Sequence, residues 1–456
     1  MELGQLVEKQ RKFFTSGATI PIEYRRRALD RLQKTLVEWE GRVSEALKKD
    51  LNKSEQEAYM CEIGLTLSEI RYVKKHMKRW NRKNHVRTPL AQYVARSYTV
   101  RNPYGVVLIM SPWNYPFLLT IVPLIGAIAA GNCCILKPSA DSLATSKVIA
   151  DLIQEVFSEE YIAVVEGGRE QNQALLEKKF DYIFFTGGAE VGKLVMKKAA
   201  ENLTPVTLEL GGKSPCIVDE TANIKMTSRR IVFGKFLNCG QTCVAPDFVL
   251  VCKSVKDELV KEIITCIKEQ YGDNPLENDA YARMINEKHF MRVTELIDKN
   301  FVTYGGNSNP ENLKIEPTIM TDVTAQHEVM HEEIFGPVLP IIEVDDVKEA
   351  YKFLKNRPSP LALYLFTSDR ETKKMFLDKV PYGGGCINDT IIHLATSSMG
   401  FGGVGSSGMG SYHGKKSFET FSHEKSIVDK ATWIDLPMRY QPYQSFYGRI
   451  IRFFLR

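Results

Sequence analysis

The chain has 456 residues, and its hydrophobic content of 44% and charged content of 25% are ordinary for a folded globular protein. A single hydrophobic core rarely extends over so long a chain, so two or more domains are expected. The 60 basic and 55 acidic side chains leave a formal charge of +5. This mild balance argues against a dedicated nucleic-acid binder, and we expect no nucleic-acid partner.

The cysteines indicate a reducing compartment, and the apolar stretches do not predict a membrane span. The nine cysteines are an odd number without a CxxC pair, so they are not a disulfide framework. The chain start lacks the basic and apolar run of a signal peptide. The most apolar region, residues 104–136, is interrupted by Pro112, Pro116 and Pro123, so we expect a buried α/β core rather than a membrane span. We therefore expect a cytoplasmic protein.

The first predicted elements are helices. Apolar residues recur three and four positions apart within residues 1–80, as in the run 28–37, and this spacing predicts two or three amphipathic helices. Residues 75–101 are more basic and polar, and Val94, Tyr98 and Val100 indicate strands there. We expect a hairpin that projects from the body.

From Gly105 onward, short apolar runs alternate with helical segments. Helices are predicted at 142–157 and 189–200, between strands at 106–110, 134–136, 162–165, 182–185 and 206–208. Strands this hydrophobic indicate a parallel sheet that is covered by helices on both faces.

A second α/β series follows Gly211. It is predicted to contain a strand at 215–218, a helix near 224–237 and a strand at 248–251. The glycine-rich segment 399–414 is predicted to be a loop, and the last forty or so residues are predicted to be a separate tail.

Two short segments carry candidate catalytic chemistry. Cys243 lies in a polar, turn-prone segment after a predicted helix, and a thiolate is the strongest protein nucleophile at neutral pH. Glu209 precedes a glycine pair and offers a carboxylate that could activate water. Together they suggest attack on a carbonyl followed by hydrolysis of a thioester. Cys243 could otherwise be a small buried hydrophobe.

Asn114 is a candidate donor to an oxyanion. It follows a predicted strand, at the edge where α/β folds place ligand sites. A fixed hydrogen-bond donor at a tetrahedral oxygen contributes about 3–4 kcal/mol to catalysis. The alternative interpretation is a helix cap or a turn residue.

The segment 184–193 follows a strand and opens a helix, and its glycines would let backbone N–H groups approach a phosphate. It nearly matches a P-loop, but Leu194 replaces the required Ser or Thr, so a nucleoside triphosphatase is rejected. A phosphate-binding turn and a plain strand–helix turn both remain open.

His327 and His331 match the H-E-x-x-H zinc motif. That motif needs a helix that places both histidines on one face, whereas Gly336 and Pro337 follow closely. We therefore expect no metal site.

Taken together, these motifs resemble the aldehyde dehydrogenase superfamily over about residues 5–445. The matching segments occur in family order, and they are Pro112–Asn114, Lys137–Ser139, Phe185–Gly187, Glu209–Lys213, Gly240–Cys243, Glu333–Pro337 and Asn388. The short N-terminus and the segment Cys243–Asp247 most resemble class 3, the branch that includes fatty aldehyde dehydrogenases.

The resemblance implies an α/β fold with a Rossmann-like cofactor domain, an α/β catalytic domain and a small bridging and oligomerisation β-element. It assigns residues 1–81 and 102–209 to NAD(P) binding, 210–395 to catalysis, and 82–101 with 396–456 to the bridging element and tail. The implied activity is NAD(P)-dependent oxidation of an aldehyde to a carboxylic acid, and the implied assembly is a homodimer.

The resemblance also implies roles for single residues. Cys243 would be the nucleophile, Asn114 would form the oxyanion hole with the Cys243 backbone N–H, and Glu209 would activate water. The implied cofactor-binding residues are Trp113, Lys137, Thr186, Gly187, Gly188, Val191, Gly192, Leu210, Glu333 and Phe335.

Three positions depart from the family pattern. Gly188 replaces a common serine, so one phosphate hydrogen bond is lost. Ala140 stands where NAD-preferring relatives often carry a glutamate, so we expect NADP to be tolerated as well as NAD. Cys239 is interpreted as a packing residue; the alternative is a reversible Cys239–Cys243 disulfide that protects the nucleophile.

Three questions stay open at this point. The tail 445–456 mixes aromatic, aliphatic and arginine residues, and we favour docking on a partner subunit or on its own domain over peripheral membrane contact. A CoA-acylating dehydrogenase is the first alternative function, although the water-activating Glu209 argues against it. A non-catalytic binding protein of the same fold is the second alternative.

Overall fold

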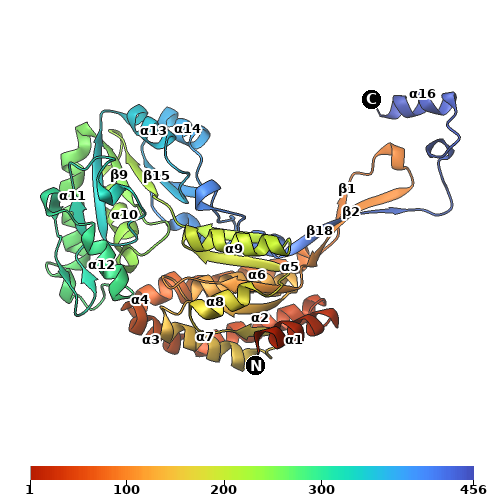
Figure 1. The fold of residues 1–456 in the computed structure, drawn as a ribbon. Helices are drawn as coiled ribbons and strands as arrows, with labels where there is room; N and C mark the ends of the chain where they lie inside the picture. Colours follow the sequence, from red (N-terminus) through yellow and green to blue (C-terminus); the bar gives the residue numbers. More distant parts are fainter. Residues whose placement is uncertain (1, 456) are drawn as a thin grey trace.

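Two α/β lobes and a projecting β-arm form the protein in the computed structural model, which describes residues 2–455 (Figure 1). The first lobe holds a six-stranded sheet of order β17-β7-β6-β3-β4-β5. Its parallel strands are β3 (Val106–Met110), β4 (Cys133–Lys137), β5 (Ile162–Val164), β6 (Tyr182–Gly187) and β7 (Val206–Leu210). All five strands predicted for this region are confirmed.

The glycine-rich segment is not entirely a loop. Within it, β17 (Gly408–Met409) pairs antiparallel with the outer edge of β7, although the sequence prediction grouped these residues with the bridging element. The close approach of β17 to β7 requires glycine at position 408. Gly408 has φ +139°, and a Cβ there would lie 2.1 Å from the Leu208 carbonyl oxygen. The pairing therefore depends on a tertiary contact that the segment's own sequence does not predict.

Helices cover both faces of the first sheet. The N-terminal region contains more than the two or three helices expected, namely α1 (Leu3–Thr15), α2 (Ile22–Glu38), α3 (Glu40–Leu51), α4 (Glu55–Ala58), a π-helical turn η1 (Tyr59–Ile63) and α5 (Gly64–Trp80). The extra boundaries arise because Gly17 and Asn52 adopt left-handed conformations, with φ +79° and +56°. The other covering helices are α6 (Leu118–Ala130), α7 (Leu143–Val156), α8 (Arg169–Leu176), α9 (Ala189–Glu201) and α15 (Gly414–Thr420).

The most apolar stretch of the sequence forms the centre of this lobe. Every residue of α6 is buried, including Pro123, and so is every residue of β3 and β4. The predicted buried core is confirmed for this stretch. Among residues 2–455, no helix has both the length and the apolar character that crossing a bilayer requires.

The second lobe holds a seven-stranded sheet of order β10-β13-β14-β9-β8-β15-β16. Its strands are β8 (Pro215–Val218), β9 (Phe248–Cys252), β10 (Val302–Tyr304), β13 (Thr318–Met320), β14 (Val338–Val344), β15 (Ala362–Phe366) and β16 (Gly384–Ile387). Its helices are α10 (Ile224–Phe236), α11 (Lys256–Tyr271), α12 (Glu287–Glu295), α13 (Val347–Lys355) and α14 (Arg370–Lys379), and a small ribbon pairs β11 (Ser308–Asn309) with β12 (Lys314–Ile315). The predicted β8, α10 and β9 are confirmed.

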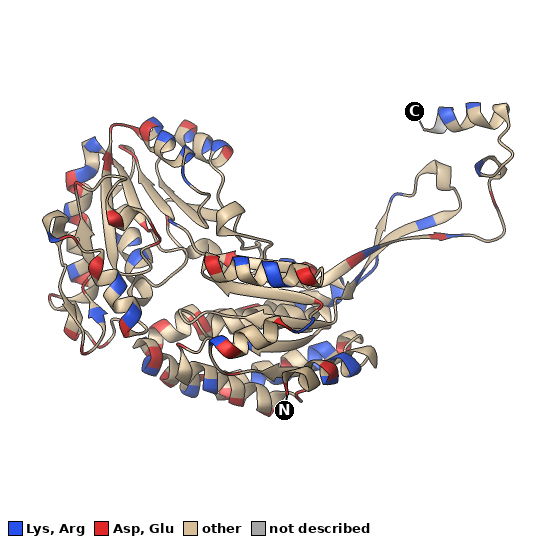
Figure 2. Ribbon diagram, in the orientation of Figure 1, with Lys and Arg blue, Asp and Glu red and all other residues tan. Residues whose placement is uncertain are grey.

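A three-stranded antiparallel arm extends away from both lobes (Figure 1). It contains β1 (Asn84–Val86), β2 (Ala95–Pro103) and β18 (Ser422–Lys430), with Asn84 opposite Thr99 and Ser422 opposite Pro103. The predicted hairpin is confirmed, although residues 75–80 belong to α5. Beyond the arm, α16 (Ser445–Phe454) stands apart from both lobes (Figure 1). Acidic and basic residues alternate along the outer helices of both lobes (Figure 2).

Candidate active site

The carboxyl ends of the first sheet face the second lobe across a cleft of about 540 Å³. Most of the predicted site residues line this cleft, namely Trp113, Asn114, Thr186, Gly187, Gly188, Val191, Glu209, Leu210, Cys243, Glu333 and Phe335. Open α/β sheets bind ligands at this edge because loops and helix N-termini converge there. The fold thus gathers into one cavity residues that are far apart in the sequence.

Cys243 is held by a tight turn that follows α10. Asn238, Cys239 and Gly240 all adopt left-handed conformations, with φ +53°, +54° and +73°. The Asn238 side chain stabilises the turn by donating to the carbonyl oxygen of Gln241 at 3.2 Å. The half-buried Cys243 side chain then faces the cleft. Burial, followed by the nearby Glu333 and Glu209 carboxylates, raises the pKa of the Cys243 thiol to about 12, so the thiol is protonated at neutral pH.

Glu209 carries its carboxyl group from β7 into the cleft without a protein partner. Its side chain is buried, and neither carboxylate oxygen accepts a hydrogen bond among the described residues. This burial raises the pKa of Glu209 well above its ordinary value. A carboxylate of raised pKa is a stronger base near neutral pH, and its free oxygens can accept a proton from water.

Asn114 lies directly beside the cysteine turn. Its side-chain Nδ2 donates to the Gln241 carbonyl oxygen at 3.0 Å, although the two residues are 127 positions apart in the sequence. A carboxamide has two N–H groups, so one is fixed by this bond and the other is available to the cleft. The next residue strengthens the junction, since the Tyr115 hydroxyl lies 2.7 Å from the Thr242 hydroxyl.

The junction of β6 and α9 fits a pyrophosphate group. Gly188 occupies the N-cap of α9 and provides no side-chain cap, so the first N–H groups of the helix remain available to an anion. The Thr186 hydroxyl is buried there without a partner among the described residues. Gly192 does not line the cleft, but it packs behind it, because a Cβ at this position would lie 2.6 Å from Leu210.

Glu333 approaches the same cleft from the second lobe. A Cβ on Gly211 would lie 1.9 Å from a Glu333 carboxylate oxygen, so a larger residue there would displace that carboxylate. Burial, with Asp247 adding to the effect, raises the pKa of Glu333 to about 8. An aromatic wall completes this side, where the Phe335 and Trp113 rings meet edge to face with centroids 5.4 Å apart.

Sequence reasoning missed several side chains that line the cleft. His289 lies with its ring 4.8 Å from Trp113, and Arg292 donates to the carbonyl oxygens of Glu333 and Ile334 at 3.3 and 2.5 Å. Both residues come from α12, whose local sequence shows only an ordinary amphipathic helix. The other missed lining residues include Leu119, Leu361, Phe401 and Tyr412.

Lys137 does not line the cleft. It ends β4, is buried, and donates from its ammonium to the carbonyl oxygen of Pro138 at 2.7 Å. Burial lowers the pKa of Lys137 to about 8. Asn388, another residue of the family pattern, lies outside the cleft as well, where its amide bridges the backbone N–H and carbonyl of Thr367 at 2.8 and 3.0 Å.

The H-E-x-x-H segment does not form the helix that the zinc motif requires. It contains only a short 3-10 turn, Glu328–Met330, with His327 at its N-cap. The His327 ring packs against Phe301 at 4.4 Å, while His331 faces Glu328 at 3.2 Å. The two histidines therefore have separate local partners.

Cys239 is fully buried on the side of the turn away from the cleft. Its sulfur lies 3.5 Å from the Tyr281 hydroxyl, within the hydrophobic core of the second lobe. Burial raises the pKa of the Cys239 thiol to about 12. These contacts support the packing interpretation over a disulfide with Cys243, because a free cysteine in such a setting behaves as a small hydrophobe.

The sequence and the fold match known proteins closely. A model of the aldehyde dehydrogenase family matches residues 1–427. The chain is 48% identical over 444 residues to 4,4'-diaponeurosporen-aldehyde dehydrogenase of Staphylococcus aureus, covering 97% of both proteins. It is 44% identical over 425 residues to aldehyde dehydrogenase family 3 member A2 of Macaca fascicularis, covering 93% of this chain and 88% of that protein.

A solved structure of the substrate-bound state of Staphylococcus aureus AldH agrees with this fold at a TM-score of 0.97, with 47% identity and 99% coverage of both chains. These relationships confirm the resemblance drawn from the motifs, and members of the family use nicotinamide cofactors. The chain therefore belongs to the aldehyde dehydrogenase family, where it groups with the class 3 members, and it is an enzyme that oxidises aldehydes.

Proposed function

We propose that Cys243, Glu209 and Asn114 carry out the oxidation of the aldehyde to a carboxylic acid. The observation that supports this assignment most directly is that all three side chains line one cleft. The Glu209 carboxylate has no hydrogen-bond partner among the described residues, and the Asn114 carboxamide uses only one of its two N–H groups to bond to Gln241. The Cys243 sulfur attacks the aldehyde carbon and loses its proton to a base in the cleft. The negative charge on the carbonyl oxygen is stabilised by an Asn114 N–H and the Cys243 backbone N–H.

When bound, NAD(P) accepts the hydride that leaves the substrate carbon. The acyl group then remains on Cys243 as a thioester. Glu209 takes a proton from water, the resulting hydroxide adds to the thioester carbon, and the Cys243 thiolate leaves as the carboxylic acid forms. Because Glu209 has no competing hydrogen-bond partner among the described residues, its carboxylate is free to orient that water.

Cofactor binding is assigned to the remaining cleft residues. The N-terminus of α9, with Thr186, Gly187, Gly188 and Val191, would hold the pyrophosphate, while Glu333 and Phe335 would contact the nicotinamide ribose side. Trp113 and Leu210 would form the adjoining walls. Lys137 would reach the adenosine ribose only if it exchanged its present bond to Pro138 for one to the ligand.

The decisive experiment compares Cys243→Ser and Glu209→Gln with the unchanged enzyme. Cys243→Ser is expected to abolish NADH formation while leaving NAD binding intact. Glu209→Gln is expected to give one NADH per site and then stop, with an acyl adduct on Cys243 in the intact mass spectrum. Full turnover by Cys243→Ser would refute the assigned nucleophile, and addition of coenzyme A separates hydrolysis from acylation.

We also propose that the enzyme is a homodimer. The arm exposes both of its outer strands, β1 and β18, and unpaired strand edges favour association. Large apolar side chains are exposed on the arm and tail, among them Leu90, Tyr93 and Trp433 at 68%, 64% and 76%. A second copy of the chain would cover these surfaces. Peripheral membrane contact through α16 is the competing explanation.

Two further proposals concern location and domain division. All nine cysteines lie within the described residues and are free thiols, which supports a cytoplasmic location. A division into residues 1–81 with 102–209, residues 210–395, and residues 82–101 with 396–456 follows the separate sheets, apart from β17 and α15, which pack on the first lobe.

A further inference from the structure

A fully buried ion pair lies beneath the segment that carries Asn114. The Lys53 ammonium and the Glu62 carboxylate are 2.5 Å apart, and both side chains are 0% exposed. Lys53 follows the left-handed Asn52 at the end of α3, and Glu62 lies in the π-helical turn η1. Neither residue lines the catalytic cleft. Their charges face the backbone of the adjoining segment, residues 114–118.

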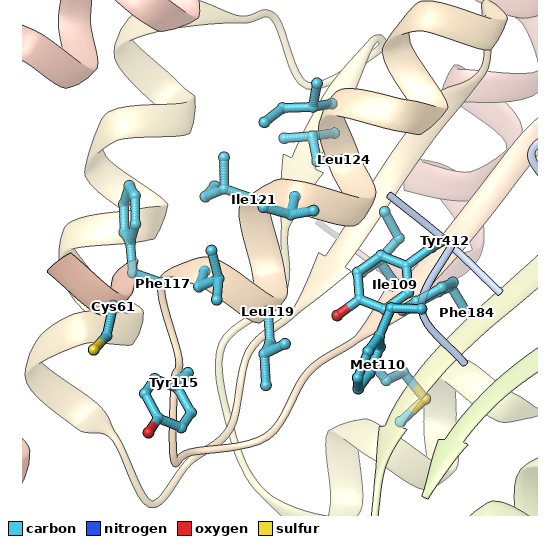
Figure 3. Packing of buried hydrophobic residues seen from close by; sticks show 14 of the residues in the cluster. Cys61, Ile109, Met110, Tyr115, Phe117, Leu119, Ile121, Leu124, Phe184 and Tyr412 are labelled. Carbon is cyan, nitrogen blue, oxygen red and sulfur yellow. The ribbon is translucent and has the colours of Figure 1, made fainter. Parts of the chain in front are cut away.

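The ion pair holds both ends of this segment. At one end, the Lys53 ammonium donates to the carbonyl oxygen of Asn114 at 2.9 Å. At the other end, the second Glu62 oxygen accepts the backbone N–H groups of Phe117 and Leu118 at 2.9 and 3.1 Å. Figure 3 shows Tyr115 and Phe117 in the segment and Leu119 just after it, with Cys61 nearby.

Glu62 also replaces a missing helix cap. The first N–H groups of an α-helix lack partners within the helix, and the N-cap residue of α6 is Phe117, which has no side-chain acceptor. The Glu62 carboxylate satisfies two of these groups and carries the favourable charge for a helix N-terminus. The starting point of α6 is therefore fixed by a residue from another element.

Stability alone does not account for the pair. Removing two charges from water is costly, and buried ion pairs often contribute no more stability than well-packed apolar residues of similar volume. In some proteins buried polar groups specify one geometry, and here each charge of the pair bonds to the backbone of the 114–118 segment. The Lys53 ammonium also lies 4.0 Å from the centre of the Tyr115 ring, so the segment is held by its side chain as well as its backbone.

The held segment is joined directly to the cysteine turn. The Asn238 side chain donates to the same Asn114 carbonyl oxygen at 2.9 Å, and the Asn114 amide donates to Gln241 at 3.0 Å. Tyr115 bonds to Thr242, the residue before Cys243. A shift of the segment would therefore change the position of the Asn114 amide relative to the Cys243 sulfur.

We propose that Lys53 and Glu62 are positioning residues, which hold the Asn114 amide where it can donate to the oxygen of the substrate carbonyl. They act through Asn114 and touch neither substrate nor cofactor. The inference rests on the proposed role of Asn114 as oxyanion donor. Such donors stabilise an oxyanion only when their position is fixed before the reaction. The residues that hold Asn114 in position are therefore needed for its role.

The test is a double-mutant cycle between the ion pair and Asn114. Lys53→Met with Glu62→Gln removes both charges of the pair together, so neither partner is left as an unpaired charge. This neutral-pair variant is made in the unchanged enzyme and in Asn114→Ala. The rate constant of NADH formation in the first turnover is measured by stopped flow, together with the NAD dissociation constant and the thermal unfolding midpoint.

The neutral-pair variant is expected to slow the first turnover by about 10- to 100-fold, a part of the loss that follows removal of a whole oxyanion donor. In Asn114→Ala the same two substitutions are expected to slow the first turnover by less than about twofold, because the effects of substitutions that act through one group are not additive. NAD affinity should stay unchanged. If the neutral-pair variant does not fold, Lys53→Arg, which keeps the charge and displaces the donor, serves in the same cycle.

Equal slowing in both backgrounds, or no slowing in either, would overturn the inference while leaving the role of Asn114 intact. An unchanged rate in Asn114→Ala itself would remove the proposed donor and the inference with it. The matched control is Arg11→Met, which breaks the 2.9 Å pair with Asp181 on the same lobe and should leave the first-turnover rate unchanged.

Discussion

Glu209 and Cys243 are two acidic groups that share one buried site. The pKa of each is raised mainly by burial, and the Glu209 charge raises that of Cys243 further. The two groups therefore oppose simultaneous ionisation. In the proposed mechanism Glu209 takes a proton from water, and a carboxylate of raised pKa can serve as this base near neutral pH.

The raised pKa of Glu209 leads to a prediction of pH dependence. A general base acts in its deprotonated form, so the steady-state rate should increase with pH as Glu209 ionises, and this limb should lie at higher pH than for an ordinary carboxylate. Glu209→Gln should lower kcat about 100-fold or more and remove the limb. The measurement is kcat across the pH range for both enzymes; a limb that persists in Glu209→Gln would assign it to another group.

The proposed tolerance of NADP rests on a single residue. Ala140 follows the β4 strand and carries no carboxylate, so a 2′-phosphate on the adenosine ribose would meet less repulsion if it bound there. We expect Ala140→Glu to lower kcat/KM for NADP about tenfold or more and to change the value for NAD much less. Ala140→Gln, which has similar size without charge, is the control. An NAD over NADP ratio in the thousands for the unchanged enzyme would contradict the proposal.

At the scale of elements, the turn between α10 and β9 determines where Cys243, the proposed nucleophile, lies. Gly240 has φ +73°, and a Cβ there would meet the Gly336 carbonyl oxygen at 2.3 Å. The backbone conformation of Gly240 therefore disfavours any other residue at this position. The turn also packs directly against the backbone of the segment that carries Glu333. Sequence periodicity predicts α10 and β9 but not this contact.

Gly240→Ala should therefore be strongly destabilising. The left-handed conformation alone costs about 1–2 kcal/mol for a residue with a Cβ, and the contact with Gly336 adds to it. Gly17→Ala is a matched control, since Gly17 has φ +79° but nothing within 4 Å of its Cβ position. Denaturant unfolding of both variants measures the difference, and an equal loss of free energy of unfolding would show that the Gly336 contact has no cost.

At the scale of the whole molecule, the arm and tail are the parts that neither lobe buries. Figure 1 shows α16 separated from both lobes, so docking of the tail on its own domain does not occur in this structure. The arm is anchored where β2 and β18 contact α6 and α15 of the first lobe, and β2 pairs with β18 along all nine residues of each strand. An extended, anchored ribbon with exposed apolar side chains is suited to contact a second subunit.

Removal of residues 436–456 should consequently weaken the proposed dimer. Sedimentation velocity of the full chain is expected to give a dimer, and the truncated chain is expected to show a larger dissociation constant. Leu203→Ser, which changes a 90% exposed leucine on the first lobe, should have no effect. Vesicles of anionic lipid test the alternative: co-sedimentation that needs residues 436–456 would identify a membrane contact instead.

The sequence by itself determined the strands from β3 to β9, the hairpin of the arm, the helices α7, α9 and α10, and the residues that bear chemistry. Continuous apolar runs identify β3 to β9 because strands buried on both faces need them, and Cys243, Glu209 and Asn114 stand out because their chemistry is specific. Periodicity could not reveal that Asn52 and Gly17 divide the N-terminal region into additional helices, since left-handed caps depend on single residues.

Only the tertiary structure decided which side chains meet. Arg292 and His289 line the cleft from α12, and the Lys137 ammonium bonds to the carbonyl oxygen of Pro138. Lys53 bonds to the Asn114 carbonyl oxygen, and it and Glu62 lie 61 and 52 positions before Asn114 in the sequence. These contacts depend on the packing of distant elements, whereas sequence patterns report the local environment of each segment. The physical reason is that a hydrogen bond across the fold leaves no periodic signal in either of the segments that it joins.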